Sequence, residues 1–228
     1  MSTIADNIGL VSQRIRAAAD AVQRDANSIH LLAVSKTKPA QAVREAYAAG
    51  MCDFGENYLQ EALGKQAELT DLPLSWHFIG PIQSNKTRAI AENFAWVHSV
   101  DRLKIAQRLS EQRPADLPPL NICIQVNVSG EASKSGCTPA DLPALAQAIS
   151  ALPRVKLRGL MAIPEPTEDR AAQDAAFATV RDLQASLNLP LDTLSMGMSH
   201  DLESAIAQGA TWVRIGTALF GARDYGQP

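Results

Sequence analysis

Short apolar runs alternate with amphipathic segments along most of the chain. Eight runs read as strands, at 30–34, 53–55, 76–79, 96–99, 121–128, 157–162, 193–196 and 212–215. They are short and mainly apolar rather than alternating, which indicates strands of a parallel sheet buried on both faces. The segments between them predict helices at 40–49, 58–69, 86–93, 101–112, 140–151, 171–187 and 199–208.

A further helix is predicted ahead of the first strand, within residues 2–25. Its apolar residues recur at helical spacing, at Ile4, Ile8, Val11 and Ile15. Residues that favour helix starts stand at several predicted boundaries, namely Ser2 or Thr3, Asp101, Thr138 followed by Pro139, and Ser199. The pattern is therefore one leading helix followed by about eight strand–helix units.

This alternation favours an α/β fold with a closed sheet, a single (β/α)8 TIM barrel. We expect one domain over residues 1–228, with 1–25 as the leading helix. A doubly wound open sheet is the alternative, and it favours an early G-x-G-x-x-G turn for phosphate. No such glycine pattern occurs in the sequence, which favours the barrel.

Composition narrows the class of protein. Hydrophobic residues make up 46% of the 228 residues and charged residues 20%, with a formal net charge of -3. These values are typical of a globular protein, and they give no basic field for nucleic acid. Three scattered cysteines favour neither disulfides nor a metal site. The first residues resemble neither a signal peptide nor a membrane span, so we expect a cytoplasmic protein.

Lys36 follows the first predicted strand, directly before a loop that contains Pro39. The carboxyl ends of barrel strands carry the reactive groups in this fold class. An amine held at the end of a buried strand is partly desolvated, which lowers its pKa and suits it to Schiff-base chemistry. A solvated lysine at a strand end is the plain alternative.

The ends of the last two predicted strands are suited to phosphate. Ser199 follows the seventh strand, and Arg214, Gly216 and Thr217 lie at the end of the eighth. In barrels these two loops and a short helix after them commonly bind phosphate through main-chain N–H groups. A strand-end lysine and a phosphate site together indicate pyridoxal 5′-phosphate (PLP), although an aldolase acting on phosphosugars could use the same parts.

Seven sequence stretches, taken together, resemble the PLP homeostasis protein family. They are LLAVSKTKP at 31–39, FGENYLQE at 54–61, WHFIGPIQSNK at 76–86, VNVSGEASKSG at 126–136, LRGLMAI at 157–163, LSMGMSHDLESAI at 194–206 and VRIGTALFGARDY at 213–225. The resemblance implies a barrel similar to the N-terminal domain of alanine racemase, with one extra leading helix.

The resemblance also implies a role for individual residues. Lys36 matches the lysine that holds PLP covalently as a Schiff base, and Arg214 matches the arginine that faces the pyridine nitrogen. The phosphate-binding positions correspond to Ser199, Gly216 and Thr217, and a position in the pocket wall corresponds to Asn57. Two further positions are covered by the resemblance. Lys134 matches a lysine near the cofactor entrance, and His200 stands where an acidic residue is common.

The function implied is non-catalytic binding of PLP, for its buffering or its delivery to PLP-dependent apoenzymes, by a monomer without nucleic-acid or membrane partners. An alanine racemase uses a second acid–base residue from a further β-domain, and the barrel leaves no residues for one. A small PLP-dependent racemase is the alternative. Its second base would have to be Tyr58, His77 or Lys38.

Overall fold

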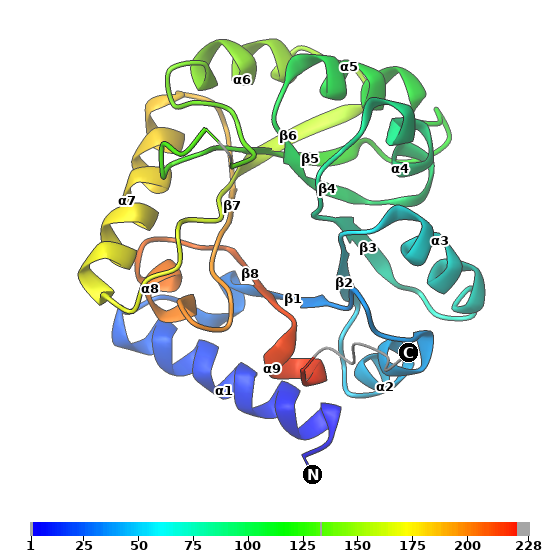
Figure 1. Ribbon diagram of the computed structural model, residues 1–228, viewed down its shortest axis with the longest axis vertical. Helices are drawn as coiled ribbons and strands as arrows, with labels where there is room; N and C mark the ends of the chain where they lie inside the picture. The colour runs from blue at the N-terminus through cyan, green and yellow to red at the C-terminus, as the bar shows by residue number, and fades with distance from the viewer. Residues whose placement is uncertain (1, 133, 223–228) are drawn as a thin grey trace.

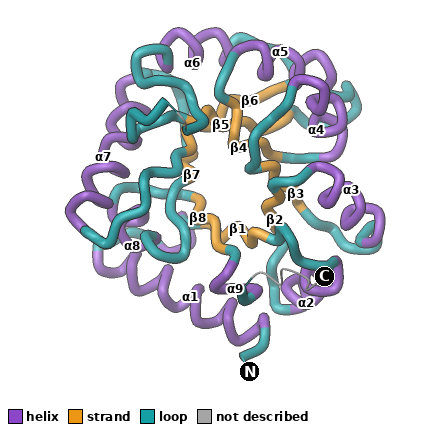
Figure 2. The backbone as a smooth tube through the Cα atoms, viewed as in Figure 1, coloured by secondary structure: helices purple, strands orange, loops and turns teal. Residues whose placement is uncertain are grey.

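Eight parallel strands form a closed barrel, with helices around its outside (Figures 1 and 2). The computed structural model describes residues 2–132 and 134–222. The strands are β1 (His30–Val34), β2 (Asp53–Glu56), β3 (Ser75–Phe78), β4 (Trp96–Val100), β5 (Leu120–Gln125), β6 (Val155–Met161), β7 (Thr193–Ser195) and β8 (Trp212–Ile215). Closure is visible at Ala33 of β1, which pairs with Phe54 of β2 and with Ile215 of β8.

The helices alternate with these strands. They are α1 (Ile4–Ala21), α2 (Ala40–Ala48), α3 (Leu59–Glu68), α4 (Thr87–Asn93), α5 (Leu103–Gln112), α6 (Leu142–Ser150), α7 (Arg170–Ser186), α8 (Leu202–Ala207) and α9 (Thr217–Phe220), with short 3-10 turns at Ala26–Ser28 and Ser84–Lys86. The predicted (β/α)8 barrel is confirmed, and the open-sheet alternative is wrong. The predicted domain of 1–228 includes Met1, Ser133 and residues 223–228, which lie outside the described residues.

The leading helix is confirmed, and it packs against the end of the barrel sequence. Thr3 caps α1 and forms a reciprocal pair of hydrogen bonds with Asp6. The Asn7 side chain donates to the Leu219 main-chain oxygen at 2.9 Å, which ties α1 to α9. Helix α1 also contacts α8. The leading helix therefore supports the two helices that follow β7 and β8.

Three other predicted helix starts are wrong, because each helix begins a few residues further along the chain. Asp101 pairs with the neighbouring Arg102 at 3.2 Å, and α5 begins two residues later. The Thr138 hydroxyl accepts from the main-chain N–H of Asp141, one residue before α6. After Ser199 the chain makes a further turn before α8 begins at Leu202.

The core lies between the barrel and its helices, with a second small cluster inside the barrel. Inward-facing residues of α1 are buried at Ile8, Val11 and Ile15, as their spacing predicts. A small buried cluster contains Leu32, Val34, Ile79 and Trp212. Among the described residues, none of the helices has the length and hydrophobicity needed to cross a bilayer.

Candidate functional site

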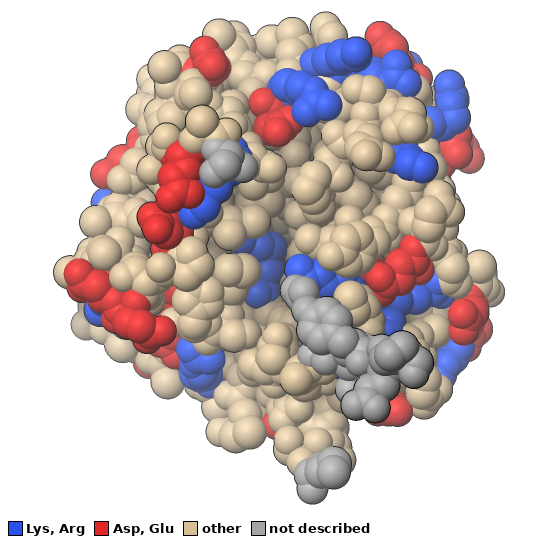
Figure 3. Space-filling view, in the orientation of Figure 1, with Lys and Arg blue, Asp and Glu red and all other residues tan. Residues whose placement is uncertain are grey.

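All six residues predicted to bind cofactor line one cavity of about 270 Å³. They are Lys36, Asn57, Ser199, Arg214, Gly216 and Thr217. Arg214 lies in β8, and the other five follow the carboxyl ends of β1, β2, β7 and β8, which are neighbours in the barrel. The volume lies just below the range of about 300–1,000 Å³ that is usual for small-molecule sites. Figure 3 shows Lys or Arg side chains at the hollow in the centre of the displayed face.

Lys36 sits in a tight turn after β1. The Lys38 N–H donates to the Ser35 main-chain oxygen at 3.1 Å and closes this turn around Lys36 and Thr37. Thr37 has a φ of 63°, in the left-handed region that a β-branched residue rarely adopts. Such a conformation persists only where its surroundings hold it in place, so the contacts around Thr37 matter for the position of Lys36.

A group of three charged residues, two of them buried, supplies these contacts. We call Glu56, Glu61 and Lys65 the Lys65 cluster. The Lys65 ammonium donates to the Ser35 main-chain oxygen at 2.6 Å, and it lies 2.6 Å from Glu56 Oε1 and 2.7 Å from Glu61 Oε1. The three N–H groups of the ammonium therefore have one acceptor oxygen each.

Each carboxylate of this cluster also binds the Lys36 turn. The Thr37 N–H donates to Glu61 Oε1 at 2.5 Å, and the Ser35 hydroxyl donates to Glu56 Oε1 at 2.7 Å. Burial raises the pKa of Glu56, and the Lys65 ammonium offsets part of that rise. The Glu56 side chain is fully buried.

Arg214 borders the cavity from β8 and is only 4% exposed. Its guanidinium donates to the Ser195 hydroxyl at 2.8 Å and to the Ala162 main-chain oxygen at 3.1 Å. Burial lowers the pKa of Arg214 to about 10, and the charge of Asp201 offsets part of this shift. Arg214 therefore stays positively charged at neutral pH.

The two loops predicted to bind phosphate meet at the cavity. Gly197 turns the chain after β7 with a φ of 99°, and the Asp201 carboxylate accepts from the Met198 N–H at 2.7 Å. This turn brings Ser199 to the cavity wall, beside the first residue of α9, Thr217. At Gly216 an added Cβ would lie 3.3 Å from the Val34 main-chain oxygen, so this strand end passes close to β1.

The residues at the cavity fit PLP in their chemistry. A primary amine suits the aldehyde, a guanidinium suits an acceptor nitrogen, and hydroxyls with main-chain N–H groups suit a phosphate. The buried Oδ1 of Asn57 has no hydrogen-bond partner among the described residues, which leaves a polar atom available at the wall. Apolar side chains complete the wall, at Val34, Ile79, Ile163 and Met198. PLP would be held by the six predicted residues.

Of the other candidate residues, His200 alone is among the described residues that line this cavity. Lys134 pairs with Glu131 at 3.6 Å and is not among the residues that line this cavity. His200 does line it, and its ring lies 3.4 Å from the Asp201 carboxylate. The three candidates for a racemase base, Tyr58, His77 and Lys38, are absent from the described lining.

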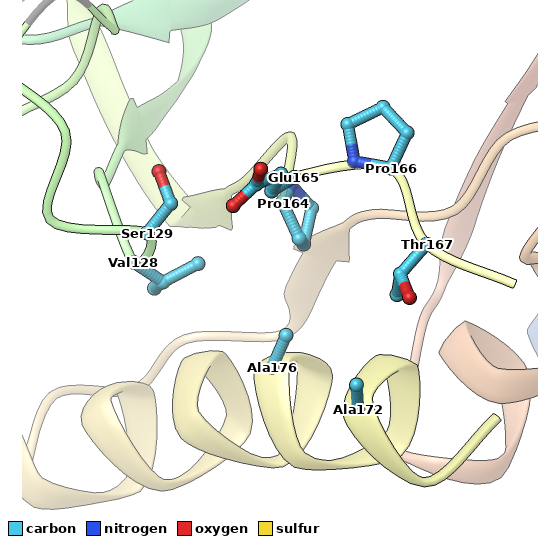
Figure 4. Close-up of a pocket in the computed structure, with 8 residues that line it drawn as sticks. All are labelled: Val128, Ser129, Pro164, Glu165, Pro166, Thr167, Ala172 and Ala176. Carbon is cyan, nitrogen blue, oxygen red and sulfur yellow. The ribbon is translucent and has the colours of Figure 1, made fainter. Parts of the chain in front are cut away.

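A second cavity of about 410 Å³ lies between the loops after β5 and β6 and helix α7 (Figure 4). It is lined by Val128, Ser129, Pro164, Glu165, Pro166, Thr167, Ala172 and Ala176. Glu165 is exposed and would repel a phosphate. Among the described residues this cavity offers no amine or guanidinium, so the smaller cavity is the candidate site. The described residues also contain no group of three or more side chains suited to a metal ion.

Comparison with known proteins decides the family. The profile described as "Alanine racemase, N-terminal domain" matches residues 11–224. The pyridoxal phosphate homeostasis protein of Pseudomonas aeruginosa is 78% identical over 228 residues, which cover 100% of this chain and 99% of that protein. The chain belongs to the pyridoxal phosphate homeostasis protein family. Another relative of the same name, from Escherichia coli K12, is 53% identical over 234 residues, 99% of both proteins.

Solved structures agree with this assignment. The structure of PipY from Synechococcus elongatus with PLP bound has a TM-score of 0.83 and 44% identity, and the match covers 96% of this chain and 100% of PipY. Alanine racemase from Corynebacterium glutamicum has a TM-score of 0.71 at 18% identity, over 99% of this chain and 63% of the racemase. The racemase thus shares the fold with this member of the PLP homeostasis protein family.

Proposed function

We propose that this chain binds PLP in the cavity at the carboxyl end of its barrel and acts in the homeostasis of that cofactor. One observation carries the proposal, namely that six residues predicted from the sequence to bind PLP line a single cavity. The names of the full-length relatives and the PLP-bound PipY structure support it.

In this proposal Lys36 holds PLP as a Schiff base. The Lys36 nitrogen forms a double bond to the aldehyde carbon, and the aldehyde oxygen leaves as water. Arg214 lies beside the pyridine nitrogen, and its permanent charge keeps that nitrogen unprotonated, which weakens the ring as an electron sink. Ser199, Gly216 and Thr217 bind the phosphate, while Asn57 lies along the ring.

The Lys65 cluster serves the same site by fixing the turn that carries Lys36. The Lys36 side chain keeps one position toward PLP only if the neighbouring Thr37 keeps its unusual backbone conformation. Glu61 holds the Thr37 N–H, and Lys65 holds the Ser35 oxygen on the other side of Lys36. A buried ion-pair cluster of this kind is costly to break, so the turn is expected to be rigid.

We propose that the protein buffers PLP or delivers it to apoenzymes, as a cytoplasmic monomer, and that it does not racemise amino acids. Tyr58 and His77 are absent from the described cavity lining, which argues against them as the second base of a racemase. Lys38 lines a small adjoining cavity with Lys36 and Thr217, and it is the remaining candidate for the racemase alternative. Incubation with L-alanine and other L-amino acids tests it. Formation of D-isomer that depends on enzyme concentration and is lost in Lys36→Ala would refute the non-catalytic part.

Titration of the cofactor-free protein with PLP tests the binding itself. A visible absorbance band of the Schiff base should appear in the wild type and be absent in Lys36→Ala. The matched control is Lys38→Ala, which removes an amine two residues away that donates to the Ala222 oxygen. This control should keep the band, and equal loss in both variants would contradict the role of Lys36.

A further inference from the structure

A continuous line of hydrogen bonds leads from Arg214 through the inside of the barrel, away from the cavity. Arg214 donates to Ser195 Oγ at 2.8 Å, and this oxygen lies 2.7 Å from His98 Nδ1. His98 Nε2 lies 2.9 Å from His77 Nδ1, and His77 Nε2 lies 3.1 Å from Asp53 Oδ1. We call these five residues the histidine network. They come from β8, β7, β4, β3 and β2.

All hydrogen bonds of the network run in one donor-to-acceptor direction, because one end can only donate and the other end can only accept. An arginine only donates and an ionised aspartate only accepts. The Ser195 hydroxyl accepts from Arg214 and so gives its own hydrogen to His98 Nδ1. His98 then donates from Nε2 to His77, and His77 donates from Nε2 to the aspartate, with the Ser75 hydroxyl also 3.3 Å from that nitrogen.

In this arrangement every donor meets an acceptor while both histidines are neutral. Both rings are fully buried, and burial lowers the pKa of His77 and of His98, so the neutral forms are the stable ones. The opposite direction would put the lone pair of His77 Nε2 against the Asp53 carboxylate. The hydrogens of all four bonds are therefore assigned by the geometry together with the burial.

The network also helps to compensate the buried positive charge of Arg214. This guanidinium is almost fully buried, and the charge of Asp201 offsets only part of the cost of burying it. A buried charge is costly unless polar groups compensate it. Through Ser195 and the two histidines, three aligned neutral groups connect Arg214 to the carboxylate of Asp53, which is 35% exposed at its side chain. Bonds aligned in one direction polarise one another.

We propose that Ser195, His98 and His77 are positioning residues that fix the direction of the Arg214 guanidinium at the cofactor site and couple that site to Asp53 at the start of β2. The inference rests on the proposed function, since it assigns Arg214 to the PLP ring. Loss of the Ser195 bond should leave Arg214 charged and held by its bond to the Ala162 oxygen alone. Both the affinity for PLP and the pH dependence of its bound spectrum should then change.

The first test compares three variants in a PLP titration followed by absorbance. Ser195→Ala removes both bonds of this hydroxyl and should weaken PLP binding by up to about tenfold, because PLP must then order a guanidinium that a hydrogen bond to a charged group otherwise holds in place. Ser195→Thr keeps a hydroxyl and should restore most of the affinity. The control Ser110→Ala removes another buried hydroxyl, which donates to the Pro153 oxygen far along the chain. It should bind PLP like the wild type.

The second test uses Asp53→Asn, which keeps an acceptor at the half-exposed end of the network and is mild for folding. It should shift the pH profile of the bound PLP spectrum, although the substitution lies at the opposite end of β2 from Asn57. In cofactor-free protein, nitrogen NMR should show His98 with its hydrogen on Nε2, and Ser195→Ala should move the Nδ1 signal.

The outcomes separate this inference from the proposed function. Absence of PLP binding in the wild type would refute the function, and with it the role given to the network. Normal PLP binding in the wild type, with unchanged affinity and pH profile in Ser195→Ala and Asp53→Asn, would overturn the network alone. Equal weakening in Ser110→Ala would also overturn it, because a general loss of stability would then explain the effect.

Discussion

The two buried histidines predict how stability changes with pH. Burial lowers the pKa of His77 and His98 below the ordinary value of 6.5. Charged and titratable groups that face the two rings also change these pKa values. Asp53 raises the pKa of His77 in part, while His30 lowers it, and Arg214 together with His77 lowers the pKa of His98. The net direction is downward for both rings.

The sign follows from proton binding in the two states. Between the lowered pKa and 6.5, the unfolded chain binds protons that the folded protein excludes, so stability falls as the pH falls. Lowering the pH from about 7.5 to about 5.5 costs about 1.4 kcal/mol for each histidine that stays neutral in the fold, and about 2.7 kcal/mol for both. Most aspartates and glutamates titrate below this window.

Urea unfolding of the cofactor-free protein at several pH values measures this loss. His98→Gln removes one of the two rings and keeps a side chain that can both donate and accept, so its pH-dependent loss should be about half that of the wild type. His200→Gln removes a histidine whose side chain is 41% exposed and should keep the wild-type loss. An equal loss in the wild type and in His98→Gln would refute the neutral, buried state of this ring. Glu56, whose pKa is raised by burial, is present in all three proteins, so its contribution to the pH dependence of stability cancels in the comparison.

Two further predictions concern the turn and the wall of the site. Lys65→Met leaves the buried Glu56 carboxylate without its cation and should destabilise the fold by about 3–5 kcal/mol in urea unfolding, whereas the double variant with Glu56→Gln should recover much of that loss. A single variant as stable as the double would contradict this. At Gly80 an added Cβ would lie 2.4 Å from the Asn57 main-chain oxygen, so Gly80→Ala should displace Asn57 and weaken PLP binding at least about tenfold. Gly64→Ala, with nothing within 4 Å, should bind PLP normally, and similar binding in both variants would refute the contact.

The barrel could be predicted from the sequence because buried parallel strands are short, continuous apolar runs. The first and last predicted strands have the observed bounds, His30–Val34 and Trp212–Ile215. The largest difference is at β5, predicted for 121–128 and observed to end at Gln125. There Val126 continues only as an isolated bridge to Cys137, and the Asn127 side chain turns to the Glu131 oxygen. Side-chain bonds of this kind leave little trace in a hydrophobic pattern.

The cavity residues could be predicted because they follow strand ends, and the resemblance assigned each of them a part of PLP. The Lys65 cluster was missed, although one signal was present. Lys65 follows Leu59 and Ala62 at three-residue steps, on the buried face of α3. A charged residue in such a position indicates a buried partner.

The histidine network could not be predicted from the sequence. His98 and Ser195 are 97 residues apart, and His77 and His98 are 21 apart. Only closure of the barrel brings these side chains together. His77 is buried and contacts the nearby Ser75, but it also contacts His98 on the next strand. Long-range polar contacts inside a barrel depend on register, which no local pattern specifies.

Borohydride reduction of the protein with PLP bound, followed by peptide mass mapping, tests the central claim most directly. Reduction converts a Schiff base into a stable secondary amine at the lysine that formed it. We predict that a pyridoxyl group is found on Lys36 in the wild type, and that Lys36→Ala is not labelled while Lys38→Ala is labelled at Lys36. Labelling of a different lysine in the wild type, or trapping only after a sugar phosphate is added, would contradict the account.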